Sequence, residues 1–155
     1  MATTETAENQ ITALNALIKI NNDRSEGYKK ALEGTEDADL KTLFSGYVAQ
    51  SQKNSTELET FVKSLGGEPA DSTSITGDLH HAWIDVKSTF TGKDRHSVLA
   101  DCEYGEDVAK KAYKKALEDT DVTWDTNISS AISSQNQGIL SAHNEVKALR
   151  DAAKS

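Results

Sequence analysis

The sequence predicts an all-α protein, a four-helix bundle with an extra short helix in the connection between the second and third main helices. Apolar residues recur at three- and four-residue intervals through four long segments, which is the pattern of a helix with one buried face. The 155 residues include one proline, a residue excluded from helix interiors. Hydrophobic residues make up 36% and aromatic residues 6% of the chain, which suits helices with wide polar faces better than a sheet sandwich.

The first two main helices are expected over residues 7–33 and 37–65. Gly34 is a stop signal, and Thr35 or Asp37 can cap the helix that follows. The connection between the two helices is therefore very short, and they are expected to run antiparallel.

A loop rich in Gly, Pro, Ser and Thr follows over residues 66–74, and a shorter helix is expected over 75–90. Residues 91–94 break this helix, and the third main helix is expected over 94–118. One continuous helix over 75–117 would be about 65 Å long, against about 40 Å for the first helix. The short helix is therefore expected in a crossover that brings the chain back to the far end of the bundle.

The fourth main helix is expected over 125–153, with Trp124 near its start. No internal repeat, low-complexity tract or linker interrupts the chain, so residues 1–155 are expected to form one domain.

Two further features lie in the crossover. The adjacent residues His80 and His81 point about 100° apart on a helix and do not chelate one ion, and Trp83 is expected to anchor the short helix to the bundle.

Composition excludes several classes of function. The formal net charge of −8 argues against a nucleic-acid partner, which demands a basic surface, and against an anionic membrane. No apolar run approaches a membrane span, and the first ten residues lack the pattern of a signal peptide. The single cysteine, Cys102, excludes an internal disulfide framework and fits a reducing compartment, so a cytoplasmic protein is expected.

The third main helix carries carboxylates at its buried face. Its apolar stripe includes Val98, Cys102, Ala109 and Tyr113. Glu106 lies within about 40° of the centre of that stripe, and Glu103 lies at its edge. A carboxylate in this position must titrate, pair with a cation or bind a metal, because a bare buried charge costs several kcal/mol.

The preferred interpretation is a buried polar layer at mid-bundle, since each main helix has polar residues near the middle of its inward face. An Arg24–Glu106 pair would neutralise both charges and fix which helices face each other. The residues expected in the layer are Asn21, Arg24, Tyr28, Ser51, Asn54, Glu106 and Gln135.

The alternative interpretation is a mononuclear metal site formed by Glu103, Glu106 and His143 and binding iron or manganese. A ferritin-type dimetal site needs inward Glu residues on two helices and a Glu-x-x-His motif on each of the other two. The chain lacks this set, because Leu140 stands three residues before His143 and Glu26 is expected to point to water. No cofactor is required by the preferred interpretation.

Three stretches, 13–32, 65–117 and 143–152, resemble a family of small bacterial proteins known mainly as a domain of unknown function. That family is placed in the ferritin-like superfamily of four-helix bundles. The most specific pieces are LHHAWIDVKSTFTGKD and CEYGED. Similar members often carry Glu where Asp101 stands, at a position expected to face solvent. The resemblance implies a ferritin-like bundle and brings no established activity with it.

Two functions from different classes therefore remain. The first is a non-catalytic bacterial bundle with a stress-associated or interaction role, as the resemblance to the superfamily implies, that acts on an unknown protein partner or by self-association. The second is a degenerate ferritin-like protein that binds iron or manganese through Glu103, Glu106 and His143. The first is favoured because two of the four helices bring no inward carboxylate.

Overall fold

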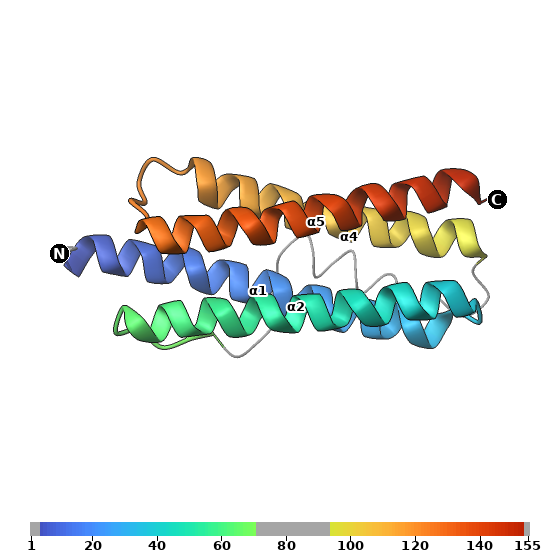
Figure 1. Cartoon of the computed structure of the whole chain (residues 1–155), viewed down its shortest axis with the longest axis horizontal. Helices are drawn as coiled ribbons and strands as arrows, with labels where there is room; N and C mark the ends of the chain where they lie inside the picture. The colour runs from blue at the N-terminus through green and yellow to red at the C-terminus, as the bar shows by residue number, and fades with distance from the viewer. Residues whose placement is uncertain (1–3, 71–93, 154–155) are drawn as a thin grey trace.

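The computed structural model describes residues 4–70 and 94–153, which form four helices and no strand. The helices are α1 (Thr4–Gly34), α2 (Ala38–Ser64), α4 (Arg95–Glu118) and α5 (Thr126–Ala152) (Figure 1). Each bound lies within three residues of the expected one. The short helix expected over 75–90, with His80, His81 and Trp83, lies outside the described residues. None of the described helices is long and apolar enough to cross a membrane.

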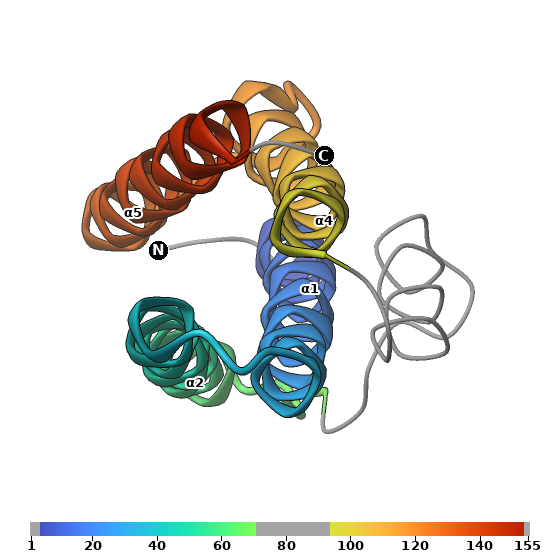
Figure 2. The same ribbon diagram turned by 90° about the vertical axis from the view of Figure 1, so that its right-hand side faces the viewer.

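The helices form two antiparallel pairs, α1 with α2 and α4 with α5 (Figure 1). The end-on view shows α1 packed against both α2 and α4, whereas α2 and α5 touch little (Figure 2). Helices α2 and α4 run in the same direction. Arg95 at the start of α4 accordingly lies 3.0 Å from Asp37 and 2.7 Å from Asp39 at the start of α2. The last residues of α2 and the first residues of α4 therefore lie at opposite ends of the bundle (Figure 1).

Local signals in the sequence set the helix ends. Helix α2 ends in a Schellman motif: the N–H of Gly66 bonds to the carbonyl of Lys63 (3.0 Å), and the N–H of Gly67 bonds to the carbonyl of Val62 (2.9 Å). Gly66 has φ +87°, a conformation that glycine adopts without steric cost. Helix α4 begins after Asp94, whose Oδ1 accepts a bond from Ser97 N at 2.8 Å, so Asp94 is the cap expected from the sequence.

The interior consists of two apolar clusters with polar side chains between them. One cluster surrounds Tyr28, Phe44 and Val146, and the other surrounds Leu17, Leu58 and Ile132. All the residues expected in the polar layer are buried, namely Asn21, Arg24, Tyr28, Ser51, Asn54, Glu106 and Gln135. The bundle therefore buries two apolar segments and a polar segment in one continuous core.

Candidate functional site

The centre of the polar layer is an ion pair between α1 and α4. Arg24 Nε donates to Glu106 Oε1 at 2.6 Å and Arg24 Nη2 donates to Glu106 Oε2 at 2.8 Å, with both side chains fully buried. Tyr28 donates its hydroxyl to the same Oε2 (2.8 Å), and Arg24 Nη1 donates to Ser51 Oγ (2.9 Å). Burial alone would lower the pKa of Arg24, but the charge and hydrogen bonds of Glu106 outweigh it and raise that pKa.

A second network crosses the bundle beside the ion pair. The Tyr113 hydroxyl accepts a bond from Asn21 Nδ2 and donates one to Gln135 Oε1, each at 2.7 Å. Asn54 donates to Asn21 Oδ1 at 3.2 Å, and Gln135 donates to Glu57 at 2.7 Å. Each side chain of this network has a neighbouring side chain as a hydrogen-bond partner, which is the condition for burying it at low cost.

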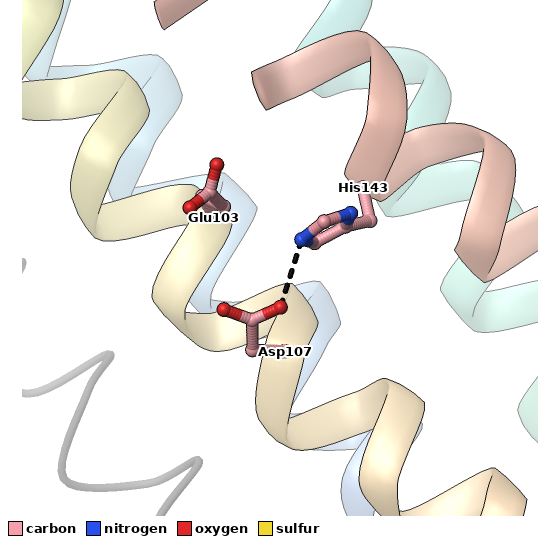
Figure 3. Close-up of side chains that lie close together, drawn as sticks. All are labelled: Glu103, Asp107 and His143. Carbon is pink, nitrogen blue, oxygen red and sulfur yellow. Dashed lines mark ion pairs between the residues drawn. The ribbon is translucent and has the colours of Figure 1, made fainter.

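A different set of side chains gathers where α4 meets α5. Glu103 and Asp107 are four residues apart on α4 and so share one face of the helix, and His143 faces them from α5 (Figure 3). One ligand atom from each residue lies within 4.8 Å of the other two. Exposed fractions of the side chains are 15% for Glu103, 43% for Asp107 and 9% for His143, so the cluster is open to solvent on the Asp107 side.

Neighbouring groups already orient these three side chains. His143 Nε2 lies 2.8 Å from Asp107 Oδ1, and His143 Nδ1 lies 3.2 Å from Asn144 Oδ1. Arg150 Nη1 donates to Glu103 Oε1 at 2.6 Å. The other oxygen, Glu103 Oε2, is buried and has no hydrogen-bond partner among the described residues. A desolvated carboxylate oxygen without a partner is unfavourable, and a bound cation would satisfy it.

The donor set is two carboxylates and one imidazole, which suits manganese, iron(II) or zinc. Metal–ligand bonds of about 2.0–2.2 Å place two ligand atoms at most about 4.4 Å apart. The ligand atoms of the cluster lie within 4.8 Å of one another, so they would have to move closer together around a bound ion.

The structure places the sequence-derived metal candidates in two different environments. It brings Glu103 and His143 together, but Glu106 points into the core, where Arg24 and Tyr28 occupy both of its oxygens. The interpretation that Glu106 lies beside Glu103 and His143 is therefore replaced by one with Asp107 as the third residue. The i,i+4 spacing of Glu103 and Asp107 was the signal in the sequence that could have identified it.

The surroundings of Glu26 and Cys102 exclude both side chains from the metal cluster. Glu26 is 56% exposed and lies 3.4 Å from Lys29, so it points to water as expected. Cys102 is fully buried, and burial raises the pKa of its thiol well above the usual range, with Glu106 adding in the same direction. A thiol in that state is a poor nucleophile and acts as a small apolar side chain.

A family model described as "Domain of unknown function (DUF2383)" matches residues 9–119. The match covers most of α1, all of α2 and the whole of α4, including Glu103 and Asp107, and ends before His143. No curated protein matches the chain.

Proposed function

Since the chain belongs to the DUF2383 family of domains of unknown function, we propose from its geometry that it is a ferritin-like bundle binding one divalent transition-metal ion through Glu103, Asp107 and His143. The convergence of three ligand atoms from two helices within 4.8 Å, one of them an imidazole nitrogen, carries the proposal. Manganese and iron(II) are the proposed ions, because both accept mixed oxygen and nitrogen ligands.

The ferritin-like part of the proposal is supported by chain direction. Helices α2 and α4 run parallel, with Arg95 beside Asp37 and Asp39, so the bundle needs one long crossover between its two antiparallel pairs. Ferritin-like bundles have this connectivity. The core differs from that of a dimetal protein, because a guanidinium, Arg24, lies against the central carboxylate of Glu106. We assign the core a structural, non-catalytic role.

Binding would use the atoms that the neighbouring groups leave available. Glu103 Oε2 would ligate the ion while Arg150 continues to hold Oε1. His143 would exchange its Nε2 contact with Asp107 for a bond to the ion, and Asn144 Oδ1 can accept a hydrogen bond from a protonated Nδ1. Partners of this kind fix the orientation of metal ligands in known sites.

A competing function is favoured by one specific observation: Arg150 and His143 already pair with Glu103 and Asp107. In that case the cluster is an ion-pair network that fastens α5 to α4, and the protein is a non-catalytic bundle that acts through its surface or by self-association. Both proposals use the same residues, so a direct metal-binding measurement separates them.

The test is titration of the purified full chain with Mn²⁺, following the electron paramagnetic resonance signal of the free ion. One bound ion per chain is expected. Asp107→Asn and His143→Gln should each weaken binding at least tenfold, whereas His96→Gln, about two turns before Glu103 on α4, serves as the matched control and should not. Absence of binding, or equal binding by the cluster variants and wild type, would reject the metal site.

A further inference from the structure

A hollow of about 390 Å³ adjoins the Glu103–Asp107–His143 cluster along the seam of α4 and α5. Asp107 lines the hollow and also belongs to the cluster, so the two share a wall. The other charged or polar lining residues are Lys110, Lys111, Lys114 and Glu118 on α4 and Asn136 on α5. Its volume lies within the range of small-molecule sites.

The lining of this hollow is more basic than the protein as a whole. Three lysines and two carboxylates, those of Asp107 and Glu118, line the hollow, whereas the chain has a formal net charge of −8. Lysines in the last turn of a helix are favoured by the helix dipole. Lys110 and Lys111 lie about two turns before Glu118, the last residue of α4, so the dipole does not account for them.

We propose that the hollow binds a small oxyanion of the phosphate type, which reaches the metal ion held by the cluster. This inference rests on the proposed metal-binding function. Three protein ligands leave an open coordination position on the ion, as in catalytic zinc sites. An oxyanion in the hollow would direct one oxygen to that position and its other oxygens to the lysine ammonium groups, which bind phosphate as point charges.

The position of Lys110 couples the two sites. Its Nζ lies 3.8 Å from Asp107 Oδ1, close enough to repel a cation bound by that carboxylate. Once an ion neutralises Asp107, the ammonium of Lys110 loses its partner and is free to bind an anion. The anion in turn screens the repulsion between Lys110 and the ion. Each ligand should therefore strengthen binding of the other by the same factor.

The experiment measures the Mn²⁺ dissociation constant of the full chain with and without inorganic phosphate, corrected by a protein-free blank. Phosphate should tighten Mn²⁺ binding by about tenfold in the wild type. In the double variant Lys110→Gln/Lys114→Gln this gain should fall below about twofold. The matched control is Lys41→Gln/Lys53→Gln, which removes two exposed lysines of α2 and should keep the gain.

The outcomes separate this inference from the proposed function. Binding of Mn²⁺ that phosphate does not change overturns the oxyanion site and leaves the metal site intact. Absence of Mn²⁺ binding overturns the metal site and the shared site with it. If acetate tightens Mn²⁺ binding as much as phosphate does, the preference for a phosphate-type anion is overturned. If the Lys41/Lys53 control loses the effect of phosphate as fully as the Lys110/Lys114 variant does, diffuse surface charge is responsible and the oxyanion site is overturned.

Discussion

Arg24 on α1 and Glu106 on α4 form a two-point ion pair inside the bundle, with N–O distances of 2.6 and 2.8 Å and no exposure of either side chain. The guanidinium also lies 5.4 Å from the ring centres of both Tyr28 and Tyr47. Each charge is compensated mainly by the other, so the pair is favourable only when α1 and α4 meet in this register. A single polar residue fixes register in coiled coils in the same way.

Glu106→Gln should destabilise the protein by about 3–5 kcal/mol, because it leaves the Arg24 guanidinium buried without a counter-charge. Urea unfolding followed by circular dichroism measures this loss. Replacing both residues with methionine should recover much of the stability, since neither charge is then left uncompensated. Glu118→Gln, at an exposed position of the same helix, is the control and should change stability by less than about 0.5 kcal/mol. A loss below about 1 kcal/mol in Glu106→Gln would show that the pair contributes little.

The helices could be predicted from the sequence because each has a continuous apolar stripe and a local stop or start signal. Gly34, Gly66 and Asp94 stand at three of the helix ends. The apolar stripe does not give the direction of α4, because its spacing is the same when it is read in either direction, and only the expected crossover indicated it. It depends on tertiary contacts such as those of Arg95 with Asp37 and Asp39.

The candidate site could be predicted only in part. Stripe analysis identifies residues that face the bundle axis, and it correctly places Glu106 there. The Glu103–Asp107–His143 cluster lies instead where α4 contacts α5, so its side chains point toward the neighbouring helix and not toward the bundle axis. Asp107 was missed because it is 43% exposed and lies off the stripe. The contact of Asp107 with His143 depends on how α5 packs against α4, and the residue spacing within a single helix does not predict that packing.

Buried tyrosines should make the protein sensitive to alkali. Burial raises the pKa of Tyr28 and of Tyr113 above the usual value, and Glu106 adds to the effect at Tyr28. Their contribution to stability is therefore fully present below about pH 10 and is lost as the pH rises, because the unfolded phenols release protons first. The free energy of unfolding should fall by up to about 1.4 kcal/mol per pH unit for each tyrosine.

Urea unfolding at pH values between about 9 and 12 measures this slope, and Tyr113→Phe should make it shallower by removing one ionisable phenol. The comparison of slopes isolates the phenol from any change in packing that the variant causes. An identical slope in the variant and wild type would show that the Tyr113 phenol does not contribute to the loss of stability at high pH.

Alanine substitutions at Gly46, within α2, and at Gly66, in its C-terminal cap, should have opposite effects on stability. Gly46 lies within α2, where an added Cβ would meet no described heavy atom within 4 Å, so Gly46→Ala should stabilise the protein by about 0.5–1 kcal/mol. Gly66 has φ +87°, so Gly66→Ala should destabilise it by about 1 kcal/mol. Thermal unfolding of the two variants measures both effects. A stabilised Gly66→Ala would show that the cap can relax out of this conformation.

Manganese should raise the melting temperature if the cluster binds it. Ligand present at 100 times its dissociation constant adds about 2.7 kcal/mol to the folded state. For a chain of this size the midpoint should rise by about 5–10 °C. EDTA should return the wild type to its starting value. Asp107→Asn should abolish the rise while changing the metal-free midpoint little, because the Asp107 side chain is 43% exposed and solvent screens its charge. If the cluster is only an ion-pair network fastening α5 to α4, wild-type melting curves with and without Mn²⁺ will coincide. An equal rise in Asp107→Asn would place the ion elsewhere on this acidic surface.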